Sequence, residues 1–322
     1  MKRESVAEAH TGELKISRAR VHKGKLRRKQ DFQKLTMMFL PLLKIFLFAY
    51  LPLMGILMAF ENYSPSKLFF SKWAGLDNFK FIFSSPLLFE LLRNALILNL
   101  LYIFFSTVIG VLLALFMFEI TNKIFLKSVQ TICFFPYFIA WPAVGVLLIS
   151  LIGMNGIITS TLGIITGSAP DIYRIPGAWP WILTALQCWK YCGFSAVTNY
   201  AVLLGIDRAM YEAADIDGAS RFQKMRYLSI PNLKFIILIN IITAFGSIIR
   251  VDFSMVYFSV GSNYALYETV DVLETYMYRA LISSSKYSQP VAMGVFQGVV
   301  GLVLSLAANG VIRRLDKDSA LF

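Results

Sequence analysis

Long apolar runs dominate this chain and restrict the folds that are open to it. Six of them lie at roughly 35–60, 94–118, 124–152, 178–206, 233–251 and 290–312. A helix needs about 20 apolar residues to cross a bilayer, and these runs are near that length or longer. Because lipid offers the backbone no hydrogen-bond partner, segments of this kind must be helical. The sequence therefore predicts an all-α integral membrane protein with six transmembrane helices.

The composition agrees with this class. Of 322 residues, 57% are hydrophobic and 16% are charged, whereas a soluble domain has about 25% charged residues. The net charge of +12 raises the alternative of a nucleic-acid-binding protein. The basic run at 23–29 contains no aromatic residue on which a base could stack, and the positive charge collects at the ends of the apolar runs. We expect contact with membrane lipid and no nucleic-acid partner.

The positions of Lys and Arg indicate the orientation. Placing both termini in the cytoplasm leaves 21 of these residues in the tails and inner loops and seven in the outer loops. Cytoplasmic loops are normally the ones enriched in Lys and Arg, so this asymmetry predicts an N-in, C-in topology. The expected divisions are a basic tail at 1–34, a six-helix transmembrane domain at 35–314 and a short C-terminal tail at 315–322.

The loop at 207–232, between the fourth and fifth spans, carries the signals of a helix pair. Asp207 is a good N-cap for one helix, and Gly218 supplies a break after it. Ser220 and Gln223 have the spacing of a capping box that opens a second helix. We expect this second helix to end before Pro231, because proline disfavours the helical conformation in the residue that precedes it.

The same loop resembles a signature of known transport proteins. Glu212-Ala213-Ala214, three residues, Gly218, nine residues and Leu228-x-Ile230-Pro231 resemble the EAA motif, which reads E-A-A, three residues, G, nine residues, I-x-L-P. The segments "KWAGLDNFKFIF" and "LLRNALILN" resemble the region before the second span of carbohydrate permeases. The chain is thus similar to permease subunits of binding-protein-dependent type I ABC importers, which have the MetI-like fold, in the branch that imports oligo- and polysaccharides.

The resemblance implies a function and a set of partners. The chain would form half of the pathway of an ATP-driven importer in a bacterial cytoplasmic membrane. Its partners would be a second permease subunit, two ATPase subunits and an extracellular solute-binding protein, with a carbohydrate as substrate. In that family the loop between spans four and five forms coupling helices that insert into the ATPase subunit. The ATPase-coupling residues would be Tyr211, Glu212, Ala213, Ala214, Asp217 and Gly218.

The chain has no G-x-x-x-x-G-K-[ST] phosphate loop, so we expect a transport subunit without its own ATPase site. ATP and Mg would be held by the partner ATPase subunits, and this chain would bind no cofactor or metal. Two other functional classes make different demands on the sequence. An ion-coupled secondary transporter of a small polar solute would call for an acid in mid-membrane, and a membrane enzyme would call for clustered catalytic acids or a metal site.

Substrate contacts are expected in spans four and five, from aromatic and hydrogen-bonding side chains of the kind that bind sugars. The candidates are Gln187, Trp189, Lys190, Tyr191, Asn199, Ser247, Arg250 and Asp252. Two interpretations of Lys190 and Arg250 are open. They extend to the outer membrane interface, with Asp252 pairing one of them, or they form a basic vestibule that favours an acidic sugar.

Three further expectations concern structure. Asn99 is expected to hydrogen-bond between helices. Pro136, Pro142 and Gly145 are expected to bend the third span. The three cysteines have no disulfide or metal spacing.

Overall fold

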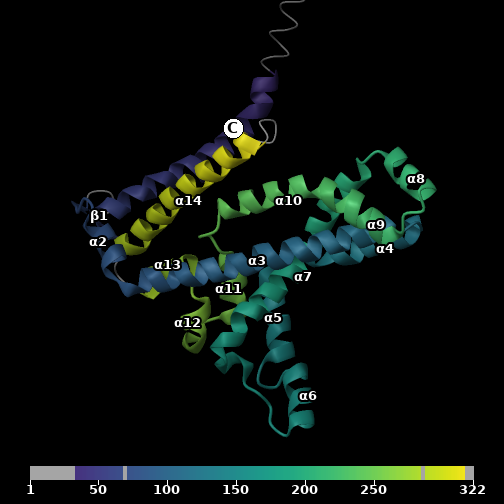
Figure 1. The fold of residues 1–322 in the computed structure, drawn as a ribbon. Coiled ribbons are helices and arrows are strands. Elements are labelled where there is room, and N and C mark those ends of the chain that lie inside the picture. Colours follow the sequence, from purple (N-terminus) through teal and green to yellow (C-terminus); the bar gives the residue numbers. More distant parts are fainter. Residues whose placement is uncertain (1–32, 68–70, 284–286, 316–322) are drawn as a thin grey trace, which may run out of the picture. The chain divides into compact units, whose positions relative to one another are not determined.

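The computed structural model describes residues 33–67, 71–283 and 287–315 (Figure 1). Nearly all regular structure in this part of the chain is helical, which confirms the predicted all-α class. Its one sheet pairs β1 (Glu61–Asn62) with β2 (Lys72–Trp73) in antiparallel register. The chain divides into two units, residues 1–57 and 58–322. The described part of the first unit is helical.

Five helices in the described part of the chain are long and apolar enough to cross a membrane. They are Gln33–Phe60, Pro86–Glu119, Trp141–Thr166, Arg221–Phe245 and Ser288–Leu315. The helix α7 (Trp179–Leu204) has 26 residues but is not among them, because polar residues such as Gln187 and Lys190 lower its hydropathy. The six-span count and the N-in, C-in orientation therefore stay predictions.

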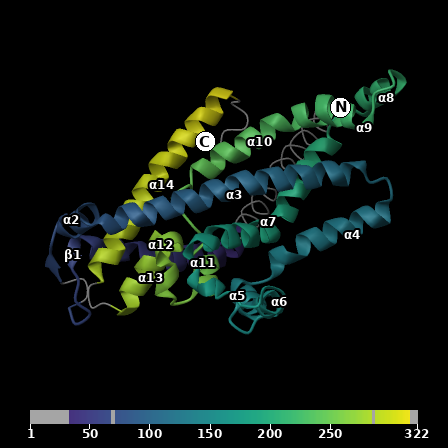
Figure 2. The ribbon, with the colours of Figure 1, turned by 60° about the horizontal axis from the view of Figure 1, so that its bottom comes forward.

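The helix α3 (Pro86–Glu119) is the longest in the second unit and runs beside α7 (Figures 1 and 2). It begins where Ser85 accepts a hydrogen bond from the N–H of Leu87 and Pro86 occupies the first turn, a position that needs no donor. It therefore starts eight residues before the predicted second span. Small residues let α3 approach α7: a Cβ at Gly110 would overlap the side chain of Ser195.

The predicted third span, 124–152, is not one helix. The helix α4 (Lys123–Phe134) passes into a 3₁₀ turn at Phe135–Phe138, and α5 (Trp141–Ile152) starts after it. Pro136 and Pro142 lie in the first turns of the 3₁₀ segment and of α5, where the missing N–H costs least. The predicted bend is thus confirmed as an interruption of the helix. After α5 the apolar segment continues into α6 (Ile157–Thr166).

Gly145 does not contribute to this bend, contrary to expectation. It lies buried inside α5, where an added Cβ would overlap the backbone carbonyl of Phe258 in α11 (Phe253–Val260). Its role is to let two helices approach closely.

The predicted fifth span, 233–251, is shifted toward the N-terminus. One helical segment runs through α9 (Arg221–Lys224), a π turn at Met225–Ser229 and α10 (Ile230–Phe245). The expectation that the second loop helix ends before Pro231 is therefore wrong. In the π turn the N–H of Ile230 donates to the carbonyl of Met225, five residues back, and this wider turn accommodates the proline ring that follows. Beyond Phe245 the chain leaves the helix until Asp252.

The long segment between the fifth and sixth predicted spans is folded, and much of it is core. It contains α11, α12 (Tyr267–Val270) and α13 (Leu273–Ser283) before α14 (Ser288–Leu315) begins. Its buried residues Met255, Val256 and Leu266 belong to one cluster with Trp141 of α5 and Leu183 of α7. This packing fixes the ends of the apolar helices against one another. A second cluster joins α2 (Asp77–Ser84) and α3 to α13 and α14.

Candidate functional site

The loop at 207–232 folds as its capping signals predict. The carboxylate of Asp207 accepts the N–H of Ala209 at 2.9 Å, which starts α8 (Arg208–Ile216). Gly218 turns the chain with φ +74°, a value that L-residues with a side chain rarely adopt. Ser220 and Gln223 then exchange hydrogen bonds of 3.3 and 2.7 Å that open α9. The caps and the turn thus separate α8 from the helical segment that begins with α9.

The outer face of this helix pair is exposed and partly apolar. Ile216 is 87% exposed, Phe222 is 65% exposed and Met210 is 45% exposed. Four of the predicted coupling residues, Glu212, Ala213, Asp217 and Gly218, are also exposed. Large exposed apolar side chains among polar and charged residues indicate a surface that another protein covers.

Tyr211 faces the other way. Its ring centroid lies 5.4 Å from that of Phe118 at the end of α3, and its hydroxyl lies 3.0 Å from that of Ser229. Lys224 also joins the pair through an ion pair of 2.6 Å with Asp215. Tyr211 therefore attaches α8 to its own chain, and Ala214 on the same helix is half-buried.

A small core lies beneath the helix pair. Its buried members are Ala114 and Leu115 of α3, Leu203 of α7 and Leu233 of α10, and Met225 of the π turn packs against them. This core therefore joins the ends of α3, α7 and α10 to the π turn that follows α9.

Ser247 and Arg250 lie together where α10 unwinds. They line a cavity of about 410 Å³ with residues of α14, namely Gly294, Gln297, Gly298, Gly301, Leu302 and Ser305. A Cβ at Gly298 or Gly301 would meet nothing within 4 Å, so these glycines leave the cavity open. Among the described residues, no ion pair neutralises Arg250. The cavity thus combines a cation with hydroxyl and amide groups.

Lys190 is buried, with 5% of its surface exposed, and does not extend to an interface. Its ammonium donates to the backbone carbonyls of Pro136, Tyr137 and Ile139 at the break in the third span, and the Pro136 carbonyl also accepts the N–H of Ile139. It also lies 5.2 Å from the ring centroid of Trp141. Lys190 therefore stabilises the break between α4 and α5.

Asp252 and Tyr191 lie in the same neighbourhood. Asp252 accepts the indole N–H of Trp141 at 2.7 Å and caps the first turn of α11 through the N–H of Ser254. The ring centroid of Tyr191 is 5.9 Å from the Lys190 ammonium. The expected ion pair of Asp252 with Lys190 or Arg250 does not form, because Trp141 and the helix cap occupy the carboxylate.

The remaining candidates on α7 are dispersed. Trp189 is 42% exposed. Gln187 and Asn199 each hold a buried side-chain oxygen without a hydrogen-bond partner among the described residues. The structure thus separates the eight predicted substrate residues into a cavity group, a group at the break between α4 and α5, and scattered positions on α7.

Comparison with known proteins gives the family. The model of the family described as "Binding-protein-dependent transport system inner membrane component" matches residues 106–320. The chain belongs to this family. It is 32% identical over 280 residues to the protein LplB of Bacillus subtilis, covering 86% of this chain and 87% of that one. The Bacillus subtilis polygalacturonan/rhamnogalacturonan transport system permease YteP is 31% identical, with 84% and 85% covered.

A solved structure agrees. A bacterial ABC transporter involved in the import of the acidic polysaccharide alginate contains a chain with 30% identity and a TM-score of 0.78, covering 89% of this chain and 97% of that one. The protein is therefore an ABC importer permease, a multi-pass component of a bacterial cytoplasmic membrane. This assignment replaces the alternatives of a secondary transporter and a membrane enzyme.

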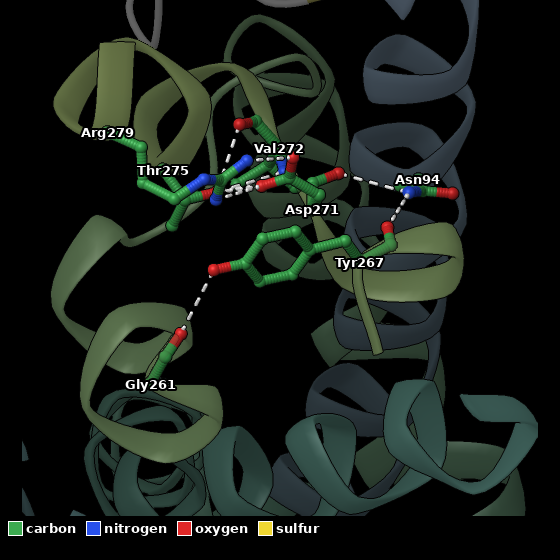
Figure 3. Close-up of polar contacts among 7 residues, drawn as sticks. All are labelled: Asn94, Gly261, Tyr267, Asp271, Val272, Thr275 and Arg279. Carbon is green, nitrogen blue, oxygen red and sulfur yellow. Dashed lines mark hydrogen bonds and ion pairs between the residues drawn. The ribbon is translucent and has the colours of Figure 1, made fainter. Parts of the chain in front are cut away.

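The permease also contains a polar network that the sequence did not reveal (Figure 3). Arg279 of α13 makes two hydrogen bonds to Asp271, at 2.8 and 2.5 Å, and its guanidinium lies 3.9 Å from the ring centroid of Tyr267. Asn94 of α3 donates to the carbonyl of Asp271 at 3.0 Å. Thr275 donates to the Asp271 carboxylate at 2.6 Å. This network attaches α12 and α13 to the first turns of α3.

Proposed function

We propose that this chain is the transmembrane permease subunit of an ATP-driven ABC importer for an oligosaccharide or polysaccharide fragment. It forms half of the translocation pathway. The saccharide class is supported by the relatives, whose names refer to polygalacturonan and rhamnogalacturonan, lactose and galactooligosaccharides. The alginate transporter supports the same class.

The coupling role is carried by one observation, the exposed outer face of α8 and α9 above a core shared by α3, α7 and α10. In this proposal Glu212, Ala213, Asp217 and Gly218 contact the ATPase subunit, with Met210 and Ile216 beside them. Tyr211 and Ala214 hold α8 on the permease. ATP-driven closure of the ATPases moves α8, and the shared core carries the movement into the long helices.

The proposed assembly contains a second permease, two ATPase subunits that hold ATP and Mg, and an extracellular binding protein. The alginate transporter in complex with a periplasmic protein bound to an alginate pentasaccharide supports the last of these partners. Its matching chain has 29% identity and a TM-score of 0.76. Membrane lipid surrounds the apolar helices.

We place saccharide recognition at the cavity that contains Ser247 and Arg250. Hydroxyl and amide donors suit sugar hydroxyls, and a guanidinium that forms no ion pair among the described residues suits a carboxylate, so the cavity favours an acidic sugar. Asp252, Tyr191 and Lys190 shape the neighbouring break, and Gln187, Trp189 and Asn199 remain proposed contacts on α7. The acidic preference is a hypothesis that rests on Arg250.

Two measurements test the proposed function. The first is purification of the tagged chain from its native cells in mild detergent; a second permease and an ATPase should co-purify. The second is uptake, in a strain that carries the whole operon, of the acidic trigalacturonate and the neutral maltotriose. Uptake that depends on this chain supports the proposal. Recovery of this chain alone, under conditions in which other ABC complexes survive, would contradict it.

A further inference from the structure

The non-helical segment between α10 and α11 is held by side chains from three other helices. Asn99 of α3 donates to the carbonyls of Ile248 and Arg250, at 2.7 and 3.1 Å. Gln297 of α14 donates to the carbonyl of Ile249 at 3.0 Å. The carboxylate of Glu274 in α13 accepts the N–H of Val251 at 3.1 Å. Four consecutive residues, 248 to 251, therefore each have a backbone group bound by a side chain from elsewhere.

These bonds replace those that the helix would have supplied. Where a helix unwinds among apolar helices, each freed backbone group needs another partner. Glu274 and Gln297 also bond to each other at 2.7 Å, so two of the three side chains act as one unit. Ile248, Ile249 and Val251 are buried, whereas Arg250 between them is exposed at the cavity. The backbone conformation of this segment thus decides where the Arg250 guanidinium lies.

We propose that Asn99, Glu274 and Gln297 are positioning residues for saccharide recognition. They clamp the backbone of residues 248–251 and so fix the Arg250 side chain in the cavity. Asn99 and Glu274 do not line the cavity, so their effect on the saccharide passes through Arg250. Gln297 lines it and has both a positioning and a direct role. This inference rests on the proposed function, because it assigns Arg250 to the saccharide.

The chain offers a matched control. Asn78 of α2 also donates to two backbone carbonyls, those of Ala59 and Glu61, at 2.9 and 3.0 Å. It lines no part of the cavity. Asn78→Ala therefore removes the same kind of contact as Asn99→Ala at a site without a connection to Arg250.

The first arm of the test measures, without a saccharide, how Asn99 and Glu274 affect the position of the side chain at residue 250. Arg250→Cys is introduced into the full complex in membrane vesicles, and its reaction rate with a membrane-impermeant methanethiosulfonate is measured. Asn99→Ala and Glu274→Ala should each change that rate several-fold, whereas Asn78→Ala should not. Glu274→Gln keeps the accepting oxygen and should restore the original rate. Equal reaction rates with and without the Asn99 and Glu274 substitutions would contradict the proposed clamp.

The second arm measures binding of radiolabelled trigalacturonate and maltotriose to the purified complex in nanodiscs, without binding protein. Arg250→Ala, Asn99→Ala and Glu274→Ala should each raise the Kd of the bound saccharide about tenfold, equivalent to about 1.4 kcal/mol. Adding Asn99→Ala to Arg250→Ala should raise it no further, because both changes remove one interaction. If Asn99→Ala fails to insert, Glu274→Ala provides the same double-variant comparison.

The two arms separate the possible failures. Additive effects in the double variant would overturn positioning through Arg250. If the wild-type complex binds neither saccharide although the first arm behaves as expected, the recognition role of this cavity fails and the clamp stands, whereas the proposed function is decided separately by co-purification.

Discussion

Trp141 donates its indole N–H to the carboxylate of Asp252 at 2.7 Å, and this bond joins the two interruptions in the apolar helices. Trp141 is the first residue of α5, directly after the break at 135–140, and Asp252 caps α11 directly after the break at 246–251. Lys190 stabilises the first break. The clamp, formed by Asn99, Glu274 and Gln297, stabilises the second. The two breaks and the side chains bonded to them therefore form one connected polar region among apolar helices.

Trp141→Phe should destabilise the permease. An aromatic ring remains at this position, but the half-buried Asp252 carboxylate loses a donor, at a cost of about 1–3 kcal/mol. The measurement is the thermal unfolding midpoint of the purified complex. Trp181→Phe is the control: Trp181 is 57% exposed and contacts Phe105 through its ring. Equal midpoints for the two variants would contradict the role of this hydrogen bond.

Lys190→Met should also lower the unfolding midpoint. Methionine fills similar space but donates no hydrogen bond, so the carbonyls of Tyr137 and Ile139 lose their side-chain donor, at a cost of about 1–3 kcal/mol. Lys44→Met, at an exposed position in the first apolar helix, should have little effect. If Lys190→Met instead changed only the preference between acidic and neutral sugars, Lys190 would be a substrate contact.

Substitutions of Gly218 should affect coupling in order of their backbone cost. Its φ of +74° is tolerated by Asn better than by Ala, which loses about 1–2 kcal/mol, and is closed to Pro. A Cβ would meet nothing within 4 Å, so the cost is conformational alone. We expect transport per ATP hydrolysed to fall from Asn to Ala to Pro. Gly177→Ala, at an open site without a positive φ, is the control.

Glu212→Lys should uncouple ATP hydrolysis from transport without changing the amount of permease in the membrane. Glu212 is exposed and its only described ion pair, with Arg208, spans 3.9 Å, so it contributes little to stability. Glu212→Gln removes the charge but keeps the shape of the side chain, so it is the control for the loss of charge alone. The assay compares ATPase activity with uptake in proteoliposomes. Normal transport in both Glu212→Lys and Gly218→Pro would refute the coupling assignment.

The stability of the permease should depend on pH through Glu274. Burial raises the pKa of its carboxyl, and hydrogen bonds to it, from Gln297 and Val251 among others, together with the charge of Arg250 offset part of that effect. The folded state then binds a proton more tightly than the unfolded state. Stability should fall as pH rises from the ordinary pKa, near 4.5, through the raised value. Glu274→Gln should flatten this slope in unfolding midpoints measured against pH. An unchanged slope would exclude Glu274 as its source.

Much of the candidate coupling site could be predicted from sequence because its signals are local. Asp207, Gly218 and the Ser220–Gln223 box act on backbone groups within three residues, and each forms the expected contact. Pro136 likewise marks the break in the third span. Asn99 in an apolar run indicated a hydrogen bond to another helix, whereas its side chain donates to carbonyls of the non-helical segment between α10 and α11. The length and hydropathy of the runs determined the all-α membrane class.

The tertiary structure alone decided what the polar side chains contact. Lys190 and Arg250 looked alike in sequence, yet one is buried against carbonyls of a distant break and the other faces a cavity. Glu274 gave no signal, because it lies in a segment that reads as an outer loop and meets Val251 only after α13 packs beside α11. Such partners are far apart in the chain. The free energy of satisfying a buried polar group depends on which groups packing brings within hydrogen-bond distance, and residue spacing does not encode that.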